Sequence, residues 1–348
     1  MSKARKLRSR KAGLPPGSLV HIGEARLPAA RINLIDFDAH GLSECEDITR
    51  PRHHATRWIN VYGAQQATDL ATISQQHDLH PLVQEDILNT AQRQKVDHYA
   101  DYLYLVLHRY SLSTVGLELE QEQISLIIGR DYLLSFQERP SQTFEPVRQR
   151  LRNPHSTLRK GGPDMLAYSL IDAVVDSYFG VIEQLDEQAD SLESQLLHKP
   201  RPQTLERIHQ LKRCVSQLRR NLHPLREVLG NLHRDADDFF GTEIQLYLRD
   251  VYDHTVHILE SLEDLRDQAT GLLDVYLSTV SHRVNLEVRA LSVVATIFMP
   301  ATLIAGVFGM NFKLMPWLEE AGGFSYALGL MGCIAVVMLA LFWRRKLV

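Results

Sequence analysis

Two apolar runs near the C-terminus constrain the fold of this chain most. Residues 290–310 and 323–343 each extend for 21 residues without a charged side chain. A helix of about 20 apolar residues crosses the hydrocarbon core of a bilayer. Because only residues 311–322 separate the runs, they are predicted to form a transmembrane hairpin with a short outer loop. A buried soluble hairpin is disfavoured, since core helices are seldom this long and this free of charge.

The charges that flank the two runs predict their orientation. Basic side chains precede the first run and follow the second: Arg283, Arg289, Arg344, Arg345 and Lys346. The loop 311–322 holds one Lys and two Glu. Because Lys and Arg accumulate on the cytoplasmic side of membranes, we expect both termini, including a basic tail at 344–348, in the cytoplasm. The chain is thus predicted to be a multi-pass protein of the cell (inner) membrane.

Composition excludes several other classes of protein. The net charge of −4 is too close to balance for a nucleic-acid-binding protein. The three cysteines are far apart and form no CxxC pair, which argues against a disulfide framework and a structural zinc site. The sequence contains no GxxxxGK[ST] phosphate loop, so ATP-driven transport is not expected. We found no catalytic motif and predict that the chain is not an enzyme.

The N-terminal half is predicted to be an α/β cytosolic domain over residues 18–160. It follows a basic tail at 1–17, which is expected to be disordered and has no apolar segment typical of a signal peptide. Residues 68–76 and 81–89 are typical of short helices. Six segments rich in β-branched and aromatic residues predict strands: SLVHI (18–22), INLIDF (32–37), WINVYG (58–63), YLYLVLHRY (102–110), QISLIIG (123–129) and YLLSFQ (132–137).

Residues 161–240 are predicted to form an antiparallel pair of helices, one acidic and one basic. Seven acids and no Lys or Arg occur within 165–198, whereas six basic residues occur within 207–226. Apolar residues within 208–232 recur at alternating steps of three and four, the spacing of a coiled-coil seam. The acidic run is compatible both with cation attraction and with a solvated face that forms ion pairs.

One long helix is predicted over residues 241–310, ending with the first transmembrane span at 290–310. No convincing helix breaker occurs from about Thr242 until Pro300, and with Pro300 as a kink the helix reaches about Phe308. Its length would be roughly 100 Å at 1.5 Å per residue.

One face of this helix is small or polar for most of its length. The residues that we assign to a pore lining are Asp274, Ser281, Asn285, Val288, Leu291, Ala295, Met299, Thr302 and Gly306. Small residues in a membrane helix also permit close helix packing, so spacing alone leaves a packing face and a pore wall open. A pore would require several copies of the chain, because two helices cannot enclose an aqueous path.

The end of the first span carries a recognisable motif. Gly309-Met310-Asn311, followed by a second span and a basic C-terminus, resembles the signature of the CorA-type magnesium/cobalt channel family, the GMN-motif divalent-cation transporters. Other segments are also similar to this family: GLPPGSLV (13–20), HPLVQEDILN (80–89), YSLIDAVVDSYF (168–179), LRDVYDHT (248–255), GLLDVYLSTVS (271–281) and ATIFMP (295–300).

The resemblance implies a fold and an activity. The fold would be an α/β cytosolic domain followed by long helices and two transmembrane helices, assembled as a funnel-shaped homopentamer in membrane lipid. The activity would be import of Mg²⁺, with Co²⁺ and Ni²⁺ tolerated, selected by Gly309, Met310 and Asn311. A ring of Asn311 carbonyls would accept hydrogen bonds from a hydrated ion, and Gly309 would permit a tight backbone path.

The resemblance also implies a regulatory Mg²⁺ site between subunits. It pairs Asp86 of one subunit with Asp250 of its neighbour, with Glu85 and Asp172 as supporting ligands. From spacing alone, Asp250, His254 and His257 share a helix face that could bind transition metals or be an ordinary surface. Two other functions stay open: a transporter of Zn²⁺ or another transition metal on the same scaffold, and a membrane-anchored metal sensor that conducts nothing.

Overall fold

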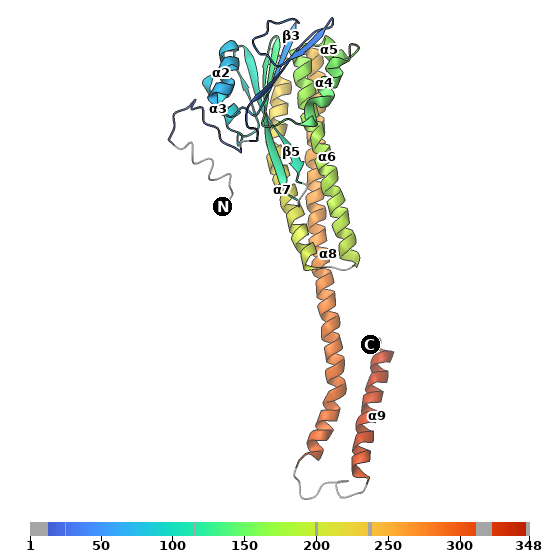
Figure 1. Ribbon diagram of the computed structural model, residues 1–348. Coiled ribbons are helices and arrows are strands. Elements are labelled where there is room, and N and C mark those ends of the chain that lie inside the picture. The colour runs from blue at the N-terminus through green and yellow to red at the C-terminus, as the bar shows by residue number, and fades with distance from the viewer. Residues whose placement is uncertain are drawn as a thin grey trace. The chain divides into compact units, whose positions relative to one another are not determined.

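The computed structural model describes residues 13–24, 26–113, 116–198, 201–235, 239–310 and 322–345 (Figure 1). The chain divides into two compact units. The first comprises Met1–Ser194 with Gln203–Gly271, and the second comprises Gln195–Pro202 with Leu272–Val348. Each unit is described by itself below.

The first unit is built on a mixed sheet of seven strands in the order β2-β1-β3-β7-β6-β5-β4. The strands are β1 (Arg31–Phe37), β2 (Leu42–Cys45), β3 (Thr56–Tyr62), β4 (Lys95–His98), β5 (Tyr102–Leu112), β6 (Leu119–Gly129) and β7 (Tyr132–Gln137). Only the central β3–β7 pair is parallel, and every other neighbouring pair is antiparallel.

The apolar runs in β5 and β6 reflect a sheet that is covered on both faces. Successive side chains of a strand point to opposite faces, so a strand covered on one face only alternates between apolar and polar residues. In β5 the residues from Tyr102 to Leu107 are all buried. A β5 side chain therefore contacts apolar neighbours whichever way it points.

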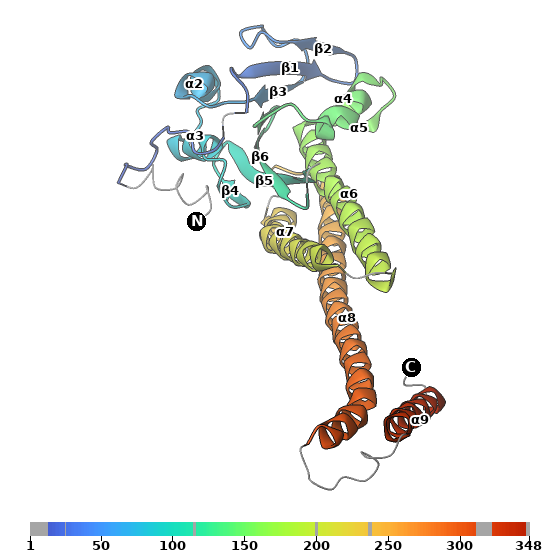
Figure 2. The same cartoon turned by 60° about the horizontal axis from the view of Figure 1, so that its bottom comes forward.

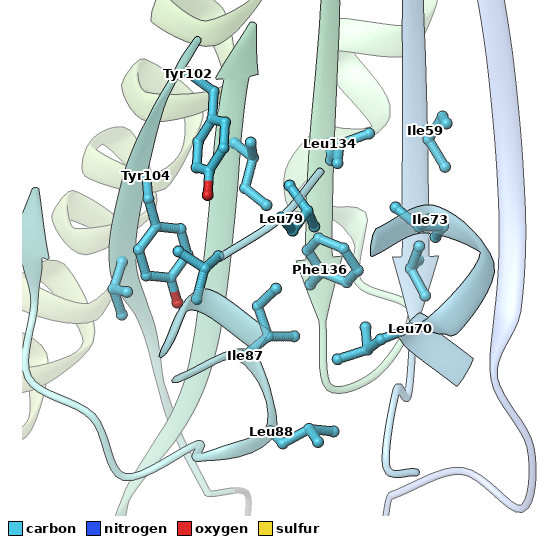
Figure 3. Close-up of a cluster of buried hydrophobic side chains, with 14 of the residues drawn as sticks. Ile59, Leu70, Ile73, Leu79, Ile87, Leu88, Tyr102, Tyr104, Leu134 and Phe136 are labelled. Carbon is cyan, nitrogen blue, oxygen red and sulfur yellow. The ribbon is translucent and has the colours of Figure 1, made fainter. Parts of the chain in front are cut away.

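One face of the sheet packs against α2 (Ala67–Gln76) and α3 (Pro81–Leu88). Figure 3 shows the shared core, in which Leu70 and Ile73 of α2 and Ile87 of α3 meet sheet residues such as Tyr104 and Phe136. Helix α3 begins with Pro81 in its first turn, and the Nδ1 atom of His80 accepts a hydrogen bond from the Leu82 amide (3.2 Å). This packing fixes the position of the two acids of α3, Glu85 and Asp86.

The helices after the sheet are η2 (Gln142–Phe144), α4 (Glu145–Arg152), α5 (Thr157–Lys160), α6 (Pro163–His198), α7 (Pro202–Asp235), α8 (Thr242–Phe308) and α9 (Gly323–Arg344). In Figure 2, α6 and α7 lie on the side of the sheet away from α2 and α3. The Tyr178 hydroxyl of α6 donates to the backbone oxygen of His108 in β5. Gln94 Nε2 donates to the backbone oxygen of Asn221 in α7 (2.7 Å), which ties that helix to the segment before β4.

Helix α7 buries the seam that its apolar spacing predicts. The seam residues are at most 1% exposed: Ile208, Leu211, Val215, Leu218, Leu222, Leu225, Leu229 and Leu232. Its arginines contact both neighbouring helices. Arg219 forms an ion pair with Glu263 of α8 (3.1 Å), and Arg207 donates to Gln188 of α6 (3.0 Å). Pairing of the basic helix is therefore not confined to the acidic helix α6.

The membrane-type helices belong to the C-terminal part of the chain. Three described helices are long and apolar enough to cross a membrane: α6, α8 and α9. Half of the apolar window of α6 is buried within the structure, whereas none of that of α8 and 6% of that of α9 is buried. The burial of α6 is explained by the core of the first unit that it helps to form, whereas the apolar windows of α8 and α9 are exposed in the single chain.

Three local expectations differ from the structure. Residues 18–22 are not a strand; Ile22 forms a single bridge with Asn89, because its hydrogen bonds go to Leu88, the last residue of α3, and to Thr90 just beyond it. The strands β2 and β4 were not predicted. Each has four residues of mixed polarity at an edge of the sheet, where short polar strands are common and leave no alternation in the sequence.

A buried histidine gives the first unit a predictable dependence on pH. His108 is 4% exposed, and burial lowers its pKa from 6.5 to about 4. Between these values the unfolded chain binds a proton that the folded chain excludes, so stability is lost as the pH falls from about 6.5 to 4. At about 1.4 kcal/mol per pKa unit the loss is on the order of 3 kcal/mol.

We expect the substitution His108→Phe to make this acid-side loss shallower. The melting temperature of the detergent-solubilised protein, measured from pH 7 to pH 4.5, tests the expectation. His155→Phe, at an exposed histidine, is the control for removal of one imidazole. A His108→Phe variant whose melting temperature falls as steeply with pH as that of the parent would contradict the assignment.

Candidate pore helix and metal-binding clusters

The nine residues assigned to the pore lining all lie on α8 and are all exposed in the single chain. The half-buried residues of the spanning part lie on another face, represented by Val293, Ile297 and Ile304. A single chain therefore leaves the predicted pore face without a covering element. The larger side chains of this face are uncovered as well: Leu291 and Met299 are each 70% exposed.

The small residues of this face form a shallow groove along α8. It has a volume of about 520 Å³ and is lined by Ala295, Phe298, Met299, Thr302, Leu303, Gly306, Val307 and Met310. A side-chain carbon added at Gly306 would meet no atom within 4 Å. The Thr302 hydroxyl donates to the Phe298 carbonyl one turn earlier (2.9 Å), which satisfies the hydroxyl within the helix. The groove is thus apolar apart from satisfied polar atoms.

The first span ends at the GMN motif. The amide of Gly309 donates to the Ala305 carbonyl (2.9 Å) and the amide of Met310 to the Val307 carbonyl (3.2 Å), so the helical turn tightens there. Gly309 does not adopt the left-handed conformation; a side-chain carbon there would lie 3.3 Å from the Ala305 carbonyl, and this close contact favours glycine. Asn311 lies outside the described residues.

The acids of α3 have partners within their own chain. Asp86 is 9% exposed and forms an ion pair with Lys95 of β4, with 2.7 Å between Oδ2 and Nζ. Its other carboxylate oxygen accepts a hydrogen bond from Gln92. Glu85 accepts one from the backbone amide of Gly17. The N-terminal segment therefore reaches α3, and Asp86 is already neutralised before any metal binds.

A second cluster of potential metal ligands lies where α6 meets α8. One ligand atom from each of Asp172, Asp176 and His254 lies within 4.8 Å of the others. His254 is 3.9 Å from Asp176 through Nδ1 and 3.8 Å from Asp250 through Nε2. The edge of the Phe179 ring supports the imidazole, with 5.9 Å between ring centroids. The helices thus place one imidazole among three carboxylates.

The ionised form of Asp172 is disfavoured in this cluster. Burial, and then the carboxylate of Asp176, raise the pKa of Asp172 to about 6. The raised pKa means that the ionised form of Asp172 is disfavoured at this position. His254 and Arg150 partly offset the shift, because each of them lowers the pKa of Asp172. A divalent cation bound there would favour the ionised form. The donor set of carboxylate oxygens and one imidazole suits Mg²⁺ through the oxygens and Co²⁺, Ni²⁺ or Zn²⁺ through both ligand types.

The structure brings together only some of the residues predicted to bind a regulatory metal. Asp172 and Asp250 share the α6–α8 cluster, whereas Glu85 and Asp86 lie on α3 at the other face of the sheet. The pairing of Asp86 with Asp250 is between subunits, and it stays a prediction. Asp176 was not among the ligands predicted from the sequence. Its spacing of four residues from Asp172 places both acids on one face of α6, which could have indicated it, and the structure adds the facing His254.

Together, the fold and these clusters define a class of protein. An α/β unit carries two groups of acidic side chains, on α3 and between α6 and α8, and helix α8 continues into an apolar stretch that is followed by the apolar helix α9. This is the organisation of a membrane protein with an α/β unit outside the apolar helices.

The comparisons identify the family. Residues 54–346 match the family of CorA-like Mg²⁺ transporter proteins, to which this chain therefore belongs. It is a family of transporters and not of enzymes. The chain is 42% identical over 343 residues to the cobalt/magnesium transport protein CorA of Thermotoga maritima, covering 97% of this chain and 98% of that protein. It is 32% identical to the putative metal ion transporter YfjQ of Bacillus subtilis, covering 82% and 88%.

Solved structures confirm the fold class. The complete structure of the CorA magnesium transporter from Methanocaldococcus jannaschii matches with a TM-score of 0.80 at 19% identity, covering 91% of this chain and 99% of that one. The full-length CmaX protein matches with a TM-score of 0.71 at 20% identity, covering 93% and 99%. The expected α/β domain followed by long helices, with apolar helices toward the C-terminus, is therefore correct.

The α6–α8 cluster leads to a prediction on metal preference. Because imidazole is a good ligand for Co²⁺ and a poor one for Mg²⁺, His254→Gln should weaken stabilisation by Co²⁺ much more than stabilisation by Mg²⁺. We expect the Co²⁺ concentration needed for half of the rise in melting temperature to increase roughly tenfold or more.

The matched control is His257→Gln, since His257 is exposed, lies one turn further on and is outside the three-residue cluster. The measurement is the melting temperature of the purified protein during titration with each ion. Equal Co²⁺ titration curves for His254→Gln and the parent would exclude His254 as a ligand.

Proposed function

We propose that this protein is a divalent-cation channel that imports Mg²⁺, and also Co²⁺ and Ni²⁺, down the electrochemical gradient. The observation that carries the proposal is the 42% identity, over almost the whole of both chains, to a protein named as a cobalt/magnesium transporter. The uncovered small and polar face of α8 supports it, because a conducting path needs such a face.

The pore is formed by a homopentamer. One chain supplies two membrane helices, which cannot surround water, so copies of α8 must line the axis. The face from Asp274 to Gly306 is the one turned inward, with Asp274, Ser281 and Asn285 continuing the polar path outside the membrane. Leu291 and Met299 are its large apolar side chains, and rings of such residues can close a pore by excluding water.

Asn311 is the selecting residue at the outer end of this path. A ring of amide carbonyls accepts hydrogen bonds from the waters of hydrated Mg²⁺, which that ion releases reluctantly. Such a ring holds the ion less tightly than carboxylates would, as conduction requires. Import then needs no ATP, because a divalent ion that moves inward gains about 4.6 kcal/mol per 100 mV, twice the single-charge value.

The protein lies in the cell (inner) membrane with both termini in the cytoplasm. The basic residues before α8 enters the membrane and after α9 support this orientation. The α/β unit is then cytoplasmic, where it meets the Mg²⁺ concentration of the cell. Regulation by internal Mg²⁺ follows from this placement of the acids on α3, α6 and α8.

Regulation acts through the boundary between subunits. Mg²⁺ bound between Asp86 of one subunit and Asp250 of its neighbour, supported by Glu85 and Asp172, ties the subunits together. Without the ion the two carboxylates repel by roughly 4 kcal/mol at 4 Å and an effective dielectric of 20, which Lys95 reduces. Five such boundaries exceed the ~5.5 kcal/mol that reverses a two-state population. The channel closes when the cell is replete.

We expect Asn311→Ala to reduce Mg²⁺ influx to near the background of protein-free liposomes. The substitution removes the carbonyl ring but adds no charge, so both spans should insert and the oligomer should form. The measurement is Mg²⁺ uptake by liposomes that contain the purified protein, with oligomeric state checked by size-exclusion chromatography. Parental Mg²⁺ uptake by a correctly assembled variant would remove Asn311 from the filter.

The double substitution Asp86→Asn, Asp250→Asn should weaken inhibition by internal Mg²⁺. Without the two charges the ion gains less by binding between subunits, so the half-inhibiting Mg²⁺ concentration should rise roughly tenfold or more. Flux is measured while Mg²⁺ is titrated on the side of the α/β unit. Asp253→Asn, an exposed acid of the same helix, is the matched control, and an unchanged inhibition curve for the double variant would rule out these carboxylates as the gate.

A transition-metal transporter on the same scaffold is the second candidate. The imidazole of His254 among carboxylates favours it, because Mg²⁺ does not require a nitrogen ligand. Competition between Mg²⁺, Co²⁺ and Zn²⁺ for uptake by the same liposomes separates the two functions. Liposomes that take up none of the three ions would instead indicate a non-conducting metal sensor.

A further inference from the structure

Lys95 occupies a position between two carboxylates of the first unit. Its Nζ lies 2.7 Å from Oδ2 of Asp86 and also forms an ion pair with Asp97, its neighbour but one on β4. The ring of Tyr104 on the adjacent strand lies beneath it, 5.5 Å from the ammonium to the ring centroid. The side chain of Lys95 is 31% exposed and that of Asp86 only 12% exposed. Asp86 is thus less accessible to solvent than the cation that neutralises it.

Besides its ion pair with Lys95, Asp86 accepts hydrogen bonds from two uncharged side chains. Its second carboxylate oxygen accepts from Gln92, and its backbone oxygen accepts from the Gln123 side chain (2.9 Å). The bond from Gln92 engages Oδ1 and leaves Oδ2 to Lys95. Burial by itself lowers the pKa of Lys95, but the hydrogen bonds to Asp86 and Asp97 outweigh it and raise the pKa. The lysine is therefore a fixed positive charge at this position.

A divalent cation and this ammonium cannot both be held closely by Asp86. Mg²⁺ requires oxygen ligands at about 2.0–2.1 Å with octahedral geometry, and a like charge hydrogen-bonded to the same carboxylate repels it. Asp97 provides an alternative, because Lys95 already contacts it and can keep that ion pair when it releases Asp86. The release then does not leave the ammonium of Lys95 without a carboxylate partner.

We propose that Lys95 competes with the regulatory divalent cation for Asp86, and so sets the cation concentration at which the site between subunits fills. Asp97 receives the ammonium when the cation binds. The inference rests on the proposed function, since it concerns the same Asp86. It adds a residue that lowers the affinity for the cation without being one of its ligands.

The test measures Mg²⁺ binding and Mg²⁺ inhibition in parallel on the full-length purified protein. Binding is followed as protection of the detergent-solubilised protein against limited proteolysis, and inhibition as flux into liposomes during titration on the side of the α/β unit. In Lys95→Gln both half-saturating Mg²⁺ concentrations should fall roughly tenfold, the factor that one charge-assisted hydrogen bond contributes.

Two matched variants control for the loss of the side chain. Lys95→Arg retains the positive charge and should keep both Mg²⁺ concentrations close to those of the parent. Lys95→Met retains the apolar stem beside Tyr104 without the charge, and should behave as Lys95→Gln. If Lys95→Gln does not fold, Lys95→Met gives the same comparison, since the partly exposed position accommodates an unbranched stem.

Asp97 provides a test of mechanism through a double-mutant cycle. Asp97→Asn leaves Lys95 with Asp86 as its remaining carboxylate, so the half-saturating Mg²⁺ concentration should rise. In a Lys95→Gln background the same substitution should have no further effect, because there is no ammonium to receive. A rise of equal size in both backgrounds would show that Asp97 acts through its own charge, and would overturn the exchange of Lys95 between the two acids.

The remaining outcomes separate this inference from the proposed function. If the parent is protected and inhibited by Mg²⁺ while Lys95→Gln has the same half-saturating concentrations, the competition is excluded and the regulatory site stands. If neither the parent nor any variant responds to Mg²⁺, the regulatory part of the proposed function fails, and the role of Lys95 fails with it.

Discussion

The continuity of α8 is the constraint on which the rest of the proposed function depends. A single helix from Thr242 to Phe308 carries Asp250 and His254 at one end and the spanning residues at the other. Its hydrogen bonding tolerates Pro300, which lacks the amide that would bond to the Thr296 carbonyl. Because backbone polar groups must be paired inside lipid, an unbroken helix is the form that the spanning part can take. Asp250, His254 and the predicted pore face therefore lie on the same helix.

Long-range features of the fold could be predicted from the sequence where a strong periodic signal was uninterrupted. The α8 helix begins and ends at the predicted residues because no breaker intervenes between Thr242 and Pro300, and the seam of α7 is buried as its spacing indicates. The edge strands β2 and β4 could not be predicted, because each has only four residues of mixed polarity. They are extended because they pair with β1 and β5, and their own sequence pattern does not indicate a strand.

The candidate sites were less predictable for a different reason. Spacing places Asp250 and His254 on one face of α8, but only tertiary packing brings them to Asp172 and Asp176 of α6. The partnership of Asp86 with Lys95 likewise joins a helix to an edge strand that the sequence did not reveal. Residues that share an element can be grouped from sequence, whereas contacts between elements need the fold.

The two clusters differ in how their charge is balanced, and this difference has a consequence for regulation. At the α6–α8 cluster, burial and then the carboxylate of Asp176 raise the pKa of Asp172, so a cation bound there would favour the ionised form. At α3 the carboxylate of Asp86 already forms an ion pair with Lys95, so under the proposed function a cation bound there would compete with the ammonium. A site that combined the acids of α3 with those of the α6–α8 cluster would bind a divalent cation more weakly than its number of carboxylates suggests. Under the proposed regulation, weak binding would let the ion leave when its concentration in the cell falls.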